Sequence, residues 1–88
     1  MKTGELANGF KYEIDETKFD DMRFLDALAE ADDGDPLAAS RVCTMLLGKD
    51  QKKALYQKLQ EEDGRVPIEA AMNCIKELME QLGGESKN

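Results

Sequence analysis

Residues 36–48, PLAASRVCTMLLG, decide how this chain folds. Asp35 and Pro36 form a helix start, because a carboxylate can accept hydrogen bonds from the first free N–H groups and proline needs no partner at the first helical position. Gly48 supplies the left-handed residue that ends the helix. At about 100° per residue, the apolar side chains of this stretch cover most of the helix and leave a narrow polar strip. We therefore expect a helix that is covered on nearly every side.

The helix before this stretch is also more apolar than a one-sided amphipathic helix needs to be. We expect it at residues 17–31, with apolar side chains over more than half of its circumference. The connection at residues 32–35 is too short for anything but an antiparallel or steeply crossed helix pair. This pair carries more apolar surface than so short a chain readily covers, so we expect the surplus to bind another protein. The candidate partner-binding residues are Met22, Phe24, Leu25, Asp26, Leu28 and Glu30.

Two thinner helices follow. The helix expected at residues 50–62 has only a narrow apolar edge at Leu55 and Leu59, which predicts a surface position. The helix expected at residues 67–82 starts at Pro67 and carries an apolar stripe of about 120°, which favours packing inside the domain. Three methionines are interpreted as core fillers: Met45, Met72 and Met79. The alternative is an adaptable recognition groove, because thioether side chains repack around varied partners.

The amino-terminal residues 1–15 predict a β-hairpin. Asn8-Gly9 is a common two-residue hairpin turn, because both residues accept a positive φ. Three apolar side chains alternate with polar ones after it: Phe10, Tyr12 and Ile14. A two-residue loop places Leu6 opposite Lys11 on the polar face, so either Leu6 is exposed or the loop is longer.

Length and composition predict a small domain with a modest core. The chain has 88 residues, 41% of them apolar and 35% charged, and a chain of this size buries only about 60 to 65% of its unfolded surface. No apolar run approaches the roughly 18 residues of a membrane span, so we expect a cytoplasmic protein. The predicted fold is mainly α (α+β): an N-terminal β-hairpin followed by a compact bundle of about four short helices. We expect a single domain over residues 1–84 and a disordered tail at residues 85–88.

The negative charge of the chain is concentrated in one segment. Net charge is −7, and residues 15–35 hold nine acids against Lys18 and Arg23. This concentration disfavours binding to nucleic acid or to an anionic membrane, which carry the same sign. A basic protein partner fits better, although acids that only solvate a helix and its ends remain an alternative. The acids are Asp15, Glu16, Asp20, Asp21, Asp26, Glu30, Asp32, Asp33 and Asp35.

The sequence contains no set of residues typical of catalysis, cofactor binding or metal binding. It has no histidine, and its two cysteines, Cys43 and Cys74, have no CxxC spacing, so we expect ordinary reduced thiols and no zinc site. Asp33-Gly34-Asp35 does not continue into an EF-hand, and Gly48-Lys49 lacks the rest of a phosphate loop. We therefore expect a protein that is not an enzyme and that needs no cofactor.

The amino-acid sequence resembles that of a known group of phage proteins. Residues 6–16, LANGFKYEIDE, and residues 24–75, which include GDPLA, LLG and DGRVP, resemble a small protein of Gram-positive phages and prophages that is similar to the tail assembly chaperones of long-tailed phages. The likeness covers about residues 3–80. It implies a non-enzymatic protein that binds the tape-measure protein, helps recruit tail-tube subunits and is absent from the finished virion.

Two other interpretations stay open. One is an acidic regulatory or inhibitory module that imitates nucleic acid, which charge reversal at Asp26 and Glu30 distinguishes from a chaperone. The other is a monomeric helical domain whose own elements cover all of its apolar surface. Self-association is also possible, with the acidic segment of one copy against a basic group on the next: Lys49, Lys52, Lys53 and Lys58.

Overall fold

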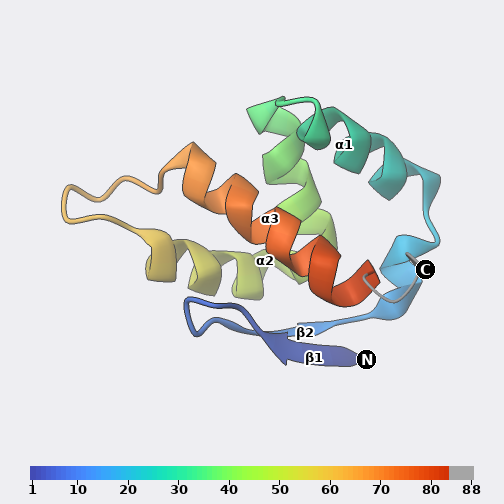
Figure 1. Ribbon diagram of the computed structural model, residues 1–88, viewed down its shortest axis with the longest axis horizontal. Helices are drawn as coiled ribbons and strands as arrows, with labels where there is room; N and C mark the ends of the chain where they lie inside the picture. Colours follow the sequence, from blue (N-terminus) through green and yellow to red (C-terminus); the bar gives the residue numbers. More distant parts are fainter. Residues whose placement is uncertain (84–88) are drawn as a thin grey trace.

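The computed structural model describes residues 1–83, so the tail expected at residues 85–88 lies outside the described residues. A two-stranded antiparallel hairpin precedes three α-helices (Figure 1). The expectation of a mainly helical chain behind an N-terminal hairpin is therefore confirmed. The elements are β1 (Lys2–Glu5), β2 (Lys11–Ile14), the 3-10 helix η1 (Glu16–Phe19), α1 (Met22–Asp32), α2 (Pro36–Leu59) and α3 (Ile68–Gly83).

Helix α2 is the element on which the others pack. Its first turn is capped as expected, since the Asp35 carboxylate accepts a hydrogen bond from the Leu37 N–H (3.0 Å). Gly48 has φ 77° and ψ 173°, which bends the helix sharply into a first half, residues 36–47, and a second half, residues 49–59. Across the bend, Lys52 Nζ donates to Thr44 Oγ1 (2.8 Å). Gly48 therefore interrupts the helix where the sequence indicated, and the two helices expected here are joined through it into one bent element. Counted in this way, residues 1–83 contain three α-helices where about four were expected.

The first expected helix is shorter than the sequence pattern suggested. We expected it from residue 17, but residues 16–19 form the 3-10 helix η1 and α1 begins only at Met22. The Asp21 carboxylate accepts a hydrogen bond from the Arg23 N–H (2.9 Å), so it caps a new helix instead of lying inside one. An aspartate that bonds the backbone two residues ahead competes with helix continuation, which explains the break.

The hairpin loop is the longer of the two alternatives. Glu5 pairs with Lys11, so five residues connect the strands, and the Leu6 N–H donates to the Phe10 carbonyl (2.8 Å). The Asn8 side chain accepts from the Phe10 N–H (2.8 Å) and stabilises the turn. This geometry turns both Leu6 and Phe10 into the core, where both side chains are buried.

The hairpin lies along the second half of α2 and the end of α3 (Figure 1). The Gln51 side chain donates to the Glu13 carbonyl (2.8 Å) and accepts from the Glu13 N–H (2.7 Å). On α3, the Tyr12 hydroxyl donates to Gln81 Oε1 (2.7 Å). Glu77 Oε2 accepts from the Ala7 N–H (2.7 Å). An isolated two-stranded ribbon is marginal in water, and these contacts fix it to the helices.

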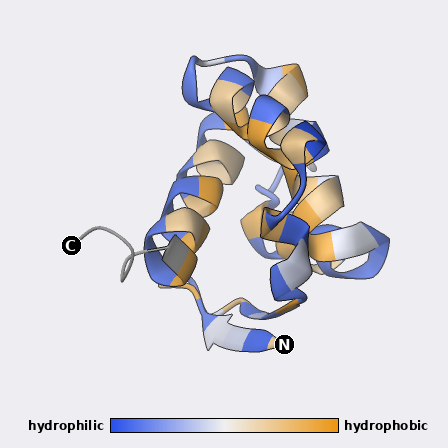
Figure 2. Ribbon diagram, turned by 90° about the vertical axis from the view of Figure 1, so that its right-hand side faces the viewer, coloured by the Kyte–Doolittle hydropathy of each residue, from blue (hydrophilic) through white to orange (hydrophobic). Residues whose placement is uncertain are grey.

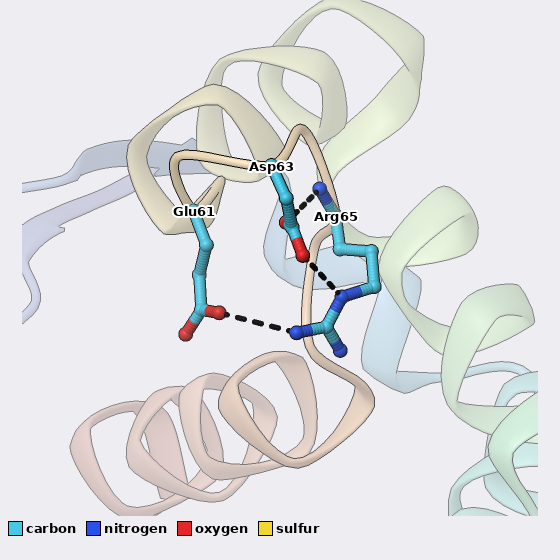
Figure 3. A network of polar contacts seen from close by, with 3 residues as sticks. All are labelled: Glu61, Asp63 and Arg65. Atoms are coloured by element: carbon cyan, nitrogen blue, oxygen red, sulfur yellow. Dashed lines mark hydrogen bonds and ion pairs between the residues drawn. The ribbon is translucent and has the colours of Figure 1, made fainter.

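The connection between α2 and α3 is an ordered turn held by Arg65 (Figure 3). Arg65 Nε lies 2.9 Å from Asp63 Oδ2, and one of its terminal nitrogens lies 3.4 Å from Glu61 Oε1. The Asp63 carboxylate also accepts from the Arg65 N–H (3.0 Å). All three side chains are exposed, where ion pairs contribute little to stability because solvent screens them. The network therefore determines the shape of the turn and adds no buried surface to the fold.

The core lies where the hairpin, α1 and α3 meet α2. Hydrophobic and hydrophilic stretches alternate along each helix, as expected for helices with one buried face (Figure 2). The largest fully buried side chains come from β2, α1, both halves of α2, and α3: Ile14, Phe24, Val42, Leu55 and Leu78. Most of the apolar circumference of α2 is thus covered inside one chain, with Leu37 in its first turn as an exposed exception. Further large apolar side chains are exposed on α1 and α3.

Candidate functional site

An open groove of about 920 Å³ separates α1 from α3, and its lining is mostly apolar. Both helices pack on α2, which lies at the bottom of the groove. Two small side chains, Ala31 of α1 and Ala39 of α2, line this bottom. Because alanine leaves room that a larger residue takes up, the groove stays deep between its two helical walls. This arrangement suits the binding of an apolar segment.

The α1 wall contains some of the residues that the sequence singled out and excludes others. Leu25 and Leu28 line the groove, and Leu25 keeps 47% of its surface exposed. Phe24 is only 1% exposed and packs edge-on against Phe19, with ring centroids 5.6 Å apart. Phe24 therefore belongs to the core, and we remove it from the candidate contact surface. Met22 is 68% exposed but lies outside the groove lining.

Sequence reasoning favoured a core position for the α3 wall and gave a recognition groove only as an alternative for its methionines. Its apolar stripe was expected to be buried, yet Ile68 is 60% exposed, and Met72 and Met79 are only partly buried. Together with Ile75, these side chains line the groove at positions i, i+4, i+7 and i+11. The methionines thus pack against the core with one side and face the groove with the other. Flexible thioether side chains adapt to partners of different shape.

The charged side chains that line the groove are mostly acidic. The lining contains three carboxylates, Asp32 of α1 and Glu69 and Glu80 of α3. It contains one cation, Lys76 of α3. All four are exposed, so their charges act on an incoming partner through solvent. Three carboxylates against one ammonium give the groove a negative rim.

The other acids of residues 15–35 have mainly structural roles. Three of them cap helices, because their carboxylates accept backbone N–H groups two residues ahead: Asp15, Asp21 and Asp35. Glu30 forms an ion pair with Arg41 of α2, and it lies outside the groove lining, as does Asp26. The acidic segment is therefore explained in part by helix capping and in part by the contact between α1 and α2.

The two cysteines are buried free thiols at the interface of α2 and α3. Burial raises the pKa of the Cys43 thiol. Burial, and secondarily the nearby Glu77 carboxylate, also raises the pKa of the Cys74 thiol. A thiol with a raised pKa is held in its neutral form, whereas a reactive cysteine has a lowered pKa and forms the thiolate.

From the raised pKa values of these thiols we predict that the free energy of unfolding decreases at alkaline pH. Because their pKa values are raised in the folded state, their contribution is complete below the unfolded-state pKa of about 8.5 and is lost as pH rises above it. Thermal denaturation followed by circular dichroism is expected to give a lower melting temperature at pH 10 than at pH 7.5. In the Cys43→Ala, Cys74→Ala double variant the slope against pH should be smaller. An unchanged slope in that variant contradicts the assignment.

No cluster of three or more His, Cys, Asp or Glu side chains fit to hold a metal ion occurs within residues 1–83. Among the helices in this range, none is long and apolar enough to cross a bilayer. A scan against protein-family models finds no match, and searches of curated proteins and of solved structures also find none.

Proposed function

We propose that this chain is a non-enzymatic phage or prophage tail assembly chaperone. It acts in the cytoplasm of the bacterial host cell, binds the tape-measure protein and helps recruit tail-tube subunits. The observation that carries the proposal is the open apolar groove between α1 and α3, with Leu25 47% exposed on one wall and Ile68 60% exposed on the other. The amino-acid sequence also resembles that of such chaperones, which supports the same class of client.

The geometry of the groove suits a helical client. Each wall presents apolar side chains at helical spacing, with Leu25 and Leu28 on one side and Met72 and Met79 on the other. An amphipathic helix laid between them places its own apolar face against both walls and completes a layer of helices on α2. A long helical client has many such segments, so several copies of the chain can cover it until assembly displaces them.

Co-expression with a phage tail tape-measure protein tests the proposal. We expect the wild-type chain to keep that protein in the soluble fraction. The Leu25→Asp variant should lower the soluble amount about tenfold or more, because the groove would have to bury an unpaired carboxylate against the client, at a cost of several kcal/mol. Circular dichroism checks that this variant still folds, since Leu25 is half exposed.

Leu37→Asp is the matched control. Leu37 is 73% exposed on α2 and does not line the groove, so the same change of charge and polarity there should leave client solubility unchanged. If Leu25→Asp retains the client as well as the wild type does, or if Leu37→Asp loses it equally, the groove is not the client site and the proposal is wrong.

A further inference from the structure

We infer that the groove binds a basic amphipathic helix of a different protein, with its apolar face against α1 and α3 and with lysine or arginine side chains beside that face. The inference rests on the proposed function insofar as the client occupies the groove. It adds the chemistry of the client segment, which the proposed function leaves open.

The length of the groove fits a helix of three to four turns. On α3 the lining runs from Ile68 to Glu80, which corresponds to about 18 Å at 1.5 Å per residue. On α1 it runs from Leu25 to Asp32 in two helical turns. A segment of about 12 residues, with apolar anchors at helical spacing, covers this length.

The charges at the rim of the groove favour a client segment with positive charge. Asp32 lies on one side of the groove, and Glu69 and Glu80 lie on the other, so a helix in the groove passes carboxylates on both flanks. Opposite charges beside an apolar face raise the encounter rate and fix the register, and like charges there disfavour the complex. Lys76 is the one cation in the lining and gives a single position at which the client can carry an acid.

A second copy of this chain does not match these requirements. Its basic segment is the second half of α2, but the main apolar side chain there, Leu55, is fully buried and Leu59 is half-buried. That segment therefore offers positive charge without a free apolar face. A symmetric dimer through two grooves instead sets the acidic rim of one copy against the acidic rim of the other.

The chain's own carboxyl-terminal residues do not match either. Residues 84–88 read GESKN and include no apolar side chain that can fill an apolar groove. The remaining exposed apolar side chains outside the groove are scattered: Met1, Met22 and Leu37. A helix of another protein thus agrees best with the shape and the charge of the groove.

The probes for this inference are two synthetic 18-residue peptides with the same leucine positions at helical spacing. One carries lysine on its polar face and the other carries glutamate, and both have blocked ends. Fluorescence anisotropy with the full chain should show the lysine peptide binding at least about tenfold more tightly at low salt, a difference of about 1.4 kcal/mol. The difference should shrink at 0.5 M salt, because exposed charges are screened.

Charge reversal within the chain gives the matched comparison. Glu80→Lys changes the rim at the last turn of α3, where a cation also suits the helix dipole, so the fold is expected to persist. Glu62→Lys changes net charge by the same amount, but Glu62 does not line the groove. Glu80→Lys should lower the preference for the lysine peptide several-fold, and Glu62→Lys should leave it nearly unchanged.

The outcomes separate this inference from the proposed function. Equal or tighter binding of the glutamate peptide overturns the inference, and so does a concentration-dependent dimer in sedimentation that Leu25→Asp abolishes. If neither peptide binds while tape-measure solubility still depends on Leu25, the inference fails and the proposed function stands. If the lysine peptide is preferred while the tape-measure protein is not kept soluble, the inference stands and the proposed function fails.

Discussion

Replacing Phe24 by alanine is expected to lower the free energy of unfolding by about 3–5 kcal/mol, which is typical of a large aromatic side chain removed from a core. Phe24 is 1% exposed and packs against Phe19, so the change leaves a cavity beneath α1. A domain of this size has only about 5–10 kcal/mol of stability in total. Thermal or urea denaturation followed by circular dichroism measures the loss, which should lower the melting temperature by about 15 °C or more.

Leu25→Ala is the control, since the two residues are adjacent on α1 and differ in environment. Leu25 is 47% exposed in the groove, so its truncation should change stability by less than about 1 kcal/mol while weakening client binding. Phe24→Ala should have the opposite profile wherever it remains folded. If both variants lose stability equally, α1 is rotated from the orientation described here and the groove assignment is wrong.

The second large effect is expected at the bend of α2. Gly48 has φ 77° and ψ 173°, a conformation that is essentially restricted to glycine. A Cβ added there meets no atom within 4 Å, so the cost of Gly48→Ala comes from the backbone and not from a clash. We expect a loss of about 1–3 kcal/mol in the free energy of unfolding, measured by urea denaturation.

A change in the chirality of residue 48 distinguishes a backbone cost from a steric clash of the added methyl group. D-alanine at position 48, introduced by chemical synthesis, adds the same methyl group, but its preferred region mirrors that of L-alanine and includes the observed angles. It should therefore match or exceed the stability of the wild type. Gly48→Asn should be as destabilising as alanine, because ψ lies far from the left-handed helical region that asparagine tolerates. Equal losses with D- and L-alanine contradict this account of the bend.

Much of the helical fold could be predicted from local signals. Asp35 and Pro36 begin α2 as the sequence indicated, and the apolar residues that follow are mostly buried. The start of α1 could not be placed, because an aspartate such as Asp21 either lies inside a helix or caps one, and tertiary packing decides between the two. The length of the loop after Leu6 was left open, because the sequence did not show whether Leu6 is exposed or buried, and packing against the helices decides this.

The candidate site could be predicted only in part. The excess apolar surface of α1 led to Leu25 and Leu28, which do line the groove. The opposite wall on α3 was interpreted as core, because an apolar stripe shows which face of a helix avoids water but not which neighbour covers it. The three-dimensional arrangement was needed to identify the groove residues of α3, because the groove forms only where α1 and α3 pack beside each other on α2. These residues include Ile68, Met72 and Met79.

The paired contacts between Gln51 and the backbone of Glu13 have a consequence for crowding. A short two-stranded ribbon offers its outer backbone to any passing peptide, and copies gathered in number can join through it into aggregates. Here a glutamine amide takes the place of the next strand at Glu13, on the side of β2 away from β1. This contact therefore hinders copies of the chain from joining through the outer edge of β2 when they are present at high concentration.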